Sequence, residues 1–277
     1  MAEEKSPFEE ERSSQEEMEK QIIPILAAAL FLSTKDLTRN STVYEIREVL
    51  NTFFTKSSEI IPILSSYIPA NIRVGLERFK KNNTFNVDFT SEEFSRLASE
   101  IFSENFDYIQ KVNDESLSTL EEEKQKRGWS DTEFIKRIKL LFGLSSLQII
   151  QTLSYEDSLI LQDKPKLDKD SIAGLVQTRV DRLQNWRIKL IATRLSVALT
   201  EESKLASWIH LEDSFQIPTG VYGKQWVSVI DEVTTQTCIN TNNEIVTLQS
   251  TFSNGSYTPP AMNPIHPCRS SLRLVKL

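Results

Sequence analysis

The chain has 277 residues, of which 39% are hydrophobic and 26% are charged. These proportions are ordinary for a soluble globular protein and exclude a chain that is disordered throughout. The formal net charge is -7, and residues 1–20 contribute -5 of it because eight glutamates stand against three basic residues there. The rest of the chain is close to neutral and lacks the basic charge that general nucleic-acid binding needs.

Glycine occurs only 7 times, which disfavours a many-stranded sandwich or barrel and favours helices. No glycine-rich phosphate loop is present, so the common nucleotide-binding motifs are excluded. The amino terminus is acidic and lacks the basic region of a secretory signal. The most apolar run, residues 22–32, is about half as long as the roughly 20 residues of a membrane span. We therefore expect a protein of the cytoplasm with no membrane contact.

The acidic segment of residues 1–20 is predicted to be a frayed helix or a flexible tail. A functional alternative is an arm that binds a basic surface on a partner and becomes ordered there. The apolar run that follows, residues 22–32, predicts a helix buried in the core, and a docking helix is the alternative.

Helix start signals recur along the next part of the chain. The S/T-x-x-E spacing of a capping box occurs at Thr42, Thr90 and Ser130, each followed by apolar residues. Segments that predict helix ends lie between them, at residues 57–58, 67–69, 82–84, 128 and 164–165. Apolar residues at spacings of three and four over 134–144 and 172–195 predict two further helical segments. We expect at least five helices between about residues 10 and 202.

The composition changes after about Leu205, where proline, threonine and asparagine become frequent. Residues 226–230 and 245–248 are rich in β-branched side chains, which predicts strands. Asn254-Gly255 predicts a hairpin turn between short strands at 251–252 and 256–257. The predicted fold class is mainly α, with a helical body and a small C-terminal α+β domain. The predicted domains are the acidic segment 1–20, the helical body 21–202 and the C-terminal domain 203–277.

A set of residues in this last part follows a recognisable order. It consists of Trp226, Asp231, Thr237, Cys238, Phe252, Gly255, Pro259, Pro260, His266, Cys268 and Arg269. In order and spacing the set resembles the C-terminal domain of phage head morphogenesis proteins of the Mu F-like type. The resemblance covers residues 212–277, about a quarter of the chain. It implies that these residues hold a small domain together and that the helical body before it is variable.

The sequence departs from the family's cysteine pattern at two positions. Thr241 follows Cys238 where many relatives have a second cysteine, and Ser270 follows Arg269 where the relatives have the last one. The remaining candidate metal ligands are Cys238, His266 and Cys268, one fewer than a structural zinc site takes. Three interpretations of the two cysteines stay open, namely small buried side chains, a residual zinc site, and a disulfide that forms after cell lysis. No cofactor is expected.

Catalysis is not expected. His266 and Cys268 stand two residues apart in a proline-flanked, extended segment, so their side chains point to opposite faces. His210 has no evident partner and is predicted to be a packing or surface residue. Residues 10–202 contain no histidine, which disfavours histidine-based and Glu-x-x-His metal catalysis in the body. An enzyme or toxin therefore stays only as an alternative hypothesis.

One face of the predicted helix after residue 170 combines cations with an aromatic ring. Arg179, Arg182, Trp186 and Lys189 lie at offsets of 0, 3, 7 and 10. They are candidates for contact with DNA or with an acidic partner surface. A solvated helix face is the simpler interpretation, and Asp181 dilutes the positive charge.

The resemblance implies a minor head protein that binds the phage portal protein during procapsid assembly in the host cytoplasm. It would then stay in the virion near the portal vertex and aid DNA packaging or ejection. Scaffold and major capsid proteins are further candidate partners. A capsid-lining or connector protein that does not bind the portal is the alternative, and the sequence does not separate the two.

Overall fold

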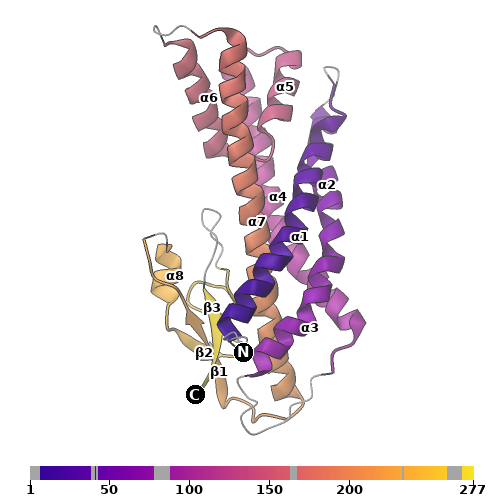
Figure 1. The fold of residues 1–277 in the computed structure, drawn as a ribbon, viewed down its shortest axis with the longest axis vertical. Coiled ribbons are helices and arrows are strands. Elements are labelled where there is room, and N and C mark those ends of the chain that lie inside the picture. The colour runs from indigo at the N-terminus through magenta and orange to yellow at the C-terminus, as the bar shows by residue number, and fades with distance from the viewer. Residues whose placement is uncertain are drawn as a thin grey trace, which may run out of the picture. The chain divides into compact units, whose positions relative to one another are not determined.

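We describe the protein from a computed structural model, which describes residues 7–38, 41, 43–77, 88–162, 167–232, 234–260 and 270–277. Most of these residues are helical, and a three-stranded antiparallel sheet lies near the carboxyl terminus (Figure 1). The predicted fold class, mainly α with a small C-terminal α+β part, is therefore confirmed.

Helices α1 to α7 come before the strands along the chain, and α8 lies between the first two strands. The elements are α1 (Pro7–Lys35), α2 (Val43–Ser57), the 3-10 helix η1 (Ser58–Ile60), α3 (Ile61–Glu77), α4 (Ser91–Arg127), α5 (Asp131–Leu141), α6 (Ser146–Ile160), α7 (Lys169–Asp213), β1 (Tyr222–Val227), α8 (Gln236–Thr241), β2 (Ile245–Thr247) and β3 (Ser271–Lys276).

The chain divides into two compact units, each assembled from separate stretches of sequence. Unit 1 comprises residues 1–22, 60–103 and 190–277, and unit 2 comprises residues 23–59 and 104–189. Unit 1 therefore contains the sheet, α8, α3 and the second part of α7. Unit 2 contains α2, α5, α6 and the first part of α7.

Several predicted helix ends match the structure. Thr90 accepts a hydrogen bond from the Glu93 amide at 3.2 Å, and the Glu93 carboxylate accepts one from the Thr90 amide at 2.7 Å, which completes a capping box. Ser130 is the N-cap of α5. Gly128, with φ of +65°, directly follows α4 and ends it, as the sequence predicts. The predicted cap at Thr42 and the breaks at 82–84 and 164–165 lie outside the described residues, in whole or in part.

The predicted break at residues 67–69 is wrong, because α3 continues through Pro69 to Glu77. Proline in a helix interior removes one backbone hydrogen bond and costs about 3 kcal/mol. Ile60, Leu64, Ile68, Ile72 and Leu76 form a buried stripe at spacings of four along η1 and α3. Burial of each such side chain contributes about 1.5–3 kcal/mol, so the stripe outweighs the lost hydrogen bond.

The core of unit 2 contains a cluster of phenylalanines. The ring of Phe53 in α2 lies 6.0 Å from that of Phe106 in α4 and 6.2 Å from that of Phe142, which ends α5. Both spacings are in the range that favours tilted and edge-to-face ring packing. Figure 1 shows α5 and α6 alongside α7 within this unit.

The sheet of unit 1 has the strand order β2-β1-β3, with both pairs antiparallel. Two of its strands overlap predicted ones. Strand β1 begins before the predicted segment 226–230 and ends inside it, and β2 covers most of 245–248. The third, β3, was not predicted, although apolar Leu272 and Leu274 stand on either side of Arg273. The predicted strands at 251–252 and 256–257 are absent from the described residues, because Asn254-Gly255 lies in an isolated turn closed from the Gly255 amide to the Phe252 carbonyl at 2.8 Å.

The two predicted domain boundaries, after residue 20 and after residue 202, lie within helices. Helix α1 begins at Pro7, inside the acidic segment 1–20, and continues through Pro24. Ile22 and Leu26 of the apolar run are fully buried. The predicted boundary between residues 202 and 203 falls within α7. Among the described helices, none has the length and the apolar character to cross a membrane.

Candidate functional site

The motif residues of the C-terminal part contribute to one hydrophobic core in unit 1. Trp226 of β1 is fully buried, and its ring meets that of Phe252 edge to face at 5.2 Å. Cys238, 6% exposed, lies in the same cluster together with Leu205 and Trp208 of α7. The indole nitrogen of Trp226 donates a hydrogen bond to the Ser228 hydroxyl at 3.0 Å. Trp226 is thus the largest side chain that the sheet contributes to this core.

The polar motif residues form a turn and a helix cap. Asp231 is exposed, and its amide donates to the Thr234 hydroxyl at 2.9 Å. Thr235 is the N-cap of α8 and accepts a hydrogen bond from the Cys238 amide. Thr237 is exposed on α8, where its carbonyl accepts a hydrogen bond from Thr241. Asp231, Thr234 and Thr235 thus form a turn and a helix cap, and these residues position Cys238 in the core.

The described residues around Cys238 offer few side chains that could bind a metal ion. The Thr241 hydroxyl, one turn along α8, donates to a backbone carbonyl, and threonine is not a usual zinc ligand. Within the described ranges, no three His, Cys, Asp or Glu side chains gather as metal ligands. His266, Cys268 and Arg269 lie outside the described residues. Cys238 itself is buried.

The remaining described motif residues shape the path between the turn and β3. Gly255 has φ of +80°, a conformation that favours glycine. Pro259 is buried, Pro260 is half-buried, and the peptide bond between them is cis. Thr258 beside them donates a hydrogen bond to the Glu202 carboxylate of α7. The segment is therefore attached to α7 within unit 1.

Unit 1 also contains a buried charged cluster that links three elements. Lys204 of α7 is 3% exposed, and its Nζ lies 2.8 Å from Glu201 Oε1 and 3.3 Å from both carboxylate oxygens of Glu11 in α1. The same Nζ donates to the Ser271 hydroxyl of β3 at 3.0 Å. Glu201 Oε2 accepts a hydrogen bond from the backbone amide of Leu272 at 2.6 Å. Burial, together with the charge of Glu11, raises the pKa of Glu201 to about 7.

A second buried lysine lies on the inner face of β1. Lys224 is 0% exposed, and its amine makes no hydrogen bond among the described residues. The amine lies over the rings of Phe252 and Tyr257, at 5.5 and 5.1 Å from their centroids. Burial lowers the pKa of Lys224 to about 8, because the neutral amine is easier to bury than the cation.

The predicted cation and aromatic face of α7 is only partly exposed. Arg182, Trp186 and Lys189 lie at the surface of unit 2, with Trp186 45% exposed. Arg179 is half-buried instead, and its guanidinium stacks on the Tyr155 ring of α6 at 5.1 Å. Three of the four candidate residues are therefore available to a partner, and Arg179 has a packing role.

An open groove of about 630 Å³ adjoins this face within unit 2. We call it the α1–α5–α7 groove. It is lined by Ala27, Leu30, Phe31 and Thr34 of α1, by Lys136, Lys139, Leu140 and Phe142 of α5 and its end, and by Gln177, Asp181, Gln184, Asn185 and Ile188 of α7. Its lining combines apolar side chains from all three helices with lysine, amide and carboxylate side chains, which makes the groove a candidate binding site.

Local structure fixes the walls of this groove. The Gln184 side chain donates hydrogen bonds to the carbonyls of Leu140 and Phe142 at 3.2 and 2.9 Å, which holds α7 against the end of α5. Gly143 has φ of +87°, and a Cβ built there would lie 2.5 Å from Leu30 Cδ1. The close approach of α1 to this turn therefore requires glycine.

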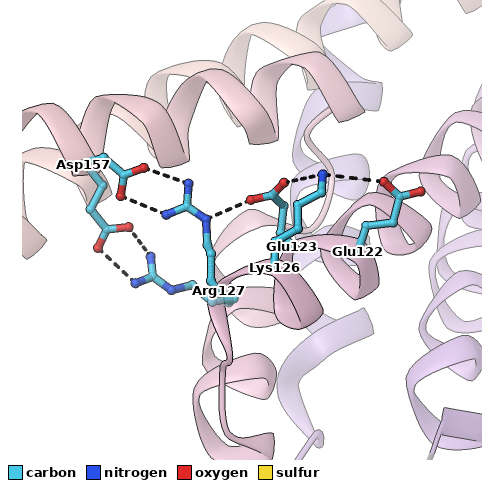
Figure 2. Close-up of polar contacts among 7 residues, drawn as sticks. Glu122, Glu123, Lys126, Arg127 and Asp157 are labelled. Atoms are coloured by element: carbon cyan, nitrogen blue, oxygen red, sulfur yellow. Dashed lines mark hydrogen bonds and ion pairs between the residues drawn. The ribbon is translucent and has the colours of Figure 1, made fainter.

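The helix ends of unit 2 are joined by a network of ion pairs around Trp129, part of which Figure 2 shows. Arg127, at the end of α4, makes two 2.8 Å hydrogen bonds to the Asp157 carboxylate of α6 and one to Glu123. Lys126 contacts Glu123 at 3.0 Å and Glu122 at 3.9 Å. The hydrogen bonds from Arg127 lower the pKa values of the Asp157 and Glu123 carboxyl groups.

A second arginine of α5 repeats this arrangement next to the first. Arg137 forms a bidentate pair with Glu156, at 2.5 and 3.0 Å, and also contacts Glu133 at 2.7 Å. The guanidinium carbons of Arg127 and Arg137 lie 6.0 and 5.4 Å from the centre of the Trp129 ring. These paired carboxylates and guanidinium groups are mutually satisfied, so they stabilise unit 2 and leave no free acid or base for chemistry.

Sequence reasoning did not find the groove or the buried charged cluster. The groove combines residues from three helices, and Glu11 lies 193 positions before Lys204. Phe31 is 67% exposed in the apolar run of residues 22–32, but only the structure shows this exposure. His210, predicted to be a packing or surface residue, is half-buried with its ring 5.0 Å from that of Phe89.

The chain matches no protein-family model, no curated protein and no solved structure.

Proposed function

We propose that the chain is a phage minor head protein of the Mu F-like type, which binds the portal during procapsid assembly and stays in the virion. The proposal rests on the ordered motif from Trp226 to Arg269. Supporting it, Trp226, Cys238 and Phe252 of that motif share one core. We also propose that the protein acts near the portal vertex and aids DNA packaging or ejection.

We further propose an assembly role without catalysis. The buried position of Cys238 supports this, because a nucleophilic thiol must reach its substrate. The ring of His210 packs against Phe89, and the carboxylates of Glu123, Glu156 and Asp157 are paired with arginines. Such groups are poorly placed for general acid–base work.

Co-expression with the portal protein of the same phage genome tests the proposed function. We expect the two proteins to elute together from a size-exclusion column at micromolar concentration. Separate elution would count against portal binding. Elution with the major capsid protein instead would favour the capsid-lining alternative.

A further inference from the structure

We propose that the α1–α5–α7 groove binds an acidic amphipathic helix of a partner protein. The proposal concerns the chemistry of the bound segment and goes beyond portal binding. It does not depend on which protein supplies the helix. Shape, charge and an exposed aromatic ring each support it.

The shape of the groove suits a helix. Gln177, Asp181, Gln184 and Ile188 line it at spacings of three and four, so one face of α7 forms a wall three turns long. At 1.5 Å per residue this wall measures roughly 16 Å, the length of about three turns of a partner helix. The floor is apolar, with Leu30, Leu140 and Phe142 from the other two helices. Side chains at every third or fourth position of a docked helix can enter such a floor.

The charge around the groove is positive and unpaired. Lys136 and Lys139 line it and are exposed, and neither forms an ion pair with any described residue. The Lys139 amine donates one hydrogen bond, to the Lys35 carbonyl at 3.2 Å. The one lining acid, Asp181, accepts a hydrogen bond from Gln177 at 2.7 Å. In a chain of net charge -7, two lining lysines without an ion pair, against one lining acid, favour a negatively charged occupant.

An exposed aromatic side chain favours a protein over DNA. Phe31, which lines the groove, is 67% exposed. Aromatic side chains dominate the binding energy of protein interfaces when a partner covers them. Phosphate groups of duplex DNA would pair with the lysines but would leave the apolar floor in contact with water. The observations therefore favour an acidic helix with apolar side chains on one face.

The experiment selects ligands without assuming a partner. A displayed library of random peptides of about 16 residues, long enough for roughly four helical turns, is depleted on the full-length Lys136→Glu/Lys139→Glu variant and then selected on the full-length wild-type chain. We expect enriched sequences with an excess of Asp and Glu and with apolar residues three or four positions apart. Both lysines are exposed, so the variant should fold, and its thermal melting curve checks this.

Synthetic copies of the enriched peptides are then titrated against variants by fluorescence anisotropy. We expect Lys136→Glu/Lys139→Glu and Phe31→Ala each to weaken binding at least about tenfold. The matched control Lys111→Glu reverses the charge of an exposed lysine of unit 2 outside the groove lining and should leave binding unchanged. Binding should also weaken as salt rises from about 50 to about 300 mM.

Three outcomes would overturn the proposal. These are a library with no enrichment over the depleted variant, enriched peptides without excess acid, and affinities that the groove variants leave unchanged. A DNA duplex of about 20 base pairs serves as competitor, and its stronger binding, lost in the same lysine variant, would assign the groove to nucleic acid instead. If the portal fails to co-elute but acidic peptides bind in the groove, the proposed function fails and this inference stands.

Discussion

The carboxyl group of Glu201 is buried in the core of unit 1. The side chain is 1% exposed, and the charged and polar groups that face it are Lys204, Glu11 and the Leu272 amide. One lysine cannot neutralise two buried carboxylates. Burial therefore favours the protonated form of Glu201 and raises its pKa.

We expect Glu201→Gln to reduce the pH dependence of stability. The pKa of Glu201 is raised in the folded chain to about 7, so its contribution to stability is complete below its ordinary value near 4.5 and is lost as pH rises through about 7. The free energy of unfolding should fall between about pH 5 and pH 8.5, on the order of 2 kcal/mol of it due to this group. Urea titrations at both pH values measure the fall.

Glu100→Gln is the matched control, because that carboxylate is exposed in unit 1 and pairs with Arg96 at the surface. This control should retain the pH dependence of the wild-type chain. An equal pH dependence in Glu201→Gln would show that another group is responsible.

Little of this cluster was visible in the sequence. Glu11 belongs to a run of acidic residues, which by itself predicts a solvated segment. Only the fold brings it to Lys204, and the same holds for Lys224, whose position in β1 turns a charged side chain toward the core. By contrast, the strand that contains Trp226 was predicted in part, because the β-branched residues of 226–230 are a local signal.

Helix ends in unit 2 depend on two arginines with different surroundings. The pair of Arg137 and Glu156 is largely buried, with 17% and 16% of the side chains exposed. The pair of Arg127 and Asp157 is more exposed, at 27% and 45%. Removal of one partner from a buried pair leaves an unsatisfied charge, whereas water replaces the partner at an exposed one.

We expect Arg137→Ala to destabilise the protein by about 2–4 kcal/mol and Arg127→Ala by about 1 kcal/mol or less. Urea unfolding of both variants, with Glu156→Ala and Asp157→Ala to complete two double-mutant cycles, measures the coupling of each pair. Arg137→Lys is the conservative control and should recover only part of the loss, since lysine cannot form the bidentate contact. Equal coupling energies in the two cycles would contradict this ranking.

Local sequence signals predicted several ends of helices correctly. Thr90, Ser130 and Gly128 mark helix ends correctly because a cap or a positive φ is satisfied within a few residues. The signal at Pro69 failed because burial of the α3 stripe is a tertiary effect. The Asn254-Gly255 turn formed without its predicted strands, since a turn signal is local and strand pairing is not.

At the scale of the whole molecule, the sheet depends on residues far from it in sequence. Its core includes Leu205 and Trp208 of α7, and the Trp208 indole donates to the Gly75 carbonyl of α3 at 3.0 Å. Glu201 holds the first residues of β3. Unit 1 is thus assembled from three stretches of chain, which a linear reading of composition could not combine.

We expect residues 203–277 expressed alone not to fold. This fragment lacks Glu201, Gly75 and Glu11, so the Leu272 amide and the Trp208 indole lose their partners and the Lys204 amine loses both of its carboxylates. Each lost partner of a buried group costs about 1–3 kcal/mol, which together is much of the stability of a small domain. The amide proton spectrum of the fragment should show narrow dispersion beside that of the full chain, and a well-dispersed spectrum would contradict the expectation.

The positions of the four tryptophans give each unit its own optical signal. Trp208 and Trp226 belong to unit 1 and are at most 1% exposed, whereas Trp129 and Trp186 belong to unit 2, with Trp186 at 45%. Indole emission moves to longer wavelengths when water reaches the ring, so the buried pair carries most of the spectral change on unfolding. A chain with Trp129→Phe and Trp186→Phe would report on unit 1 alone. Its melting curve, set beside that of the unaltered chain, would show whether the two units lose their structure in one step or in two.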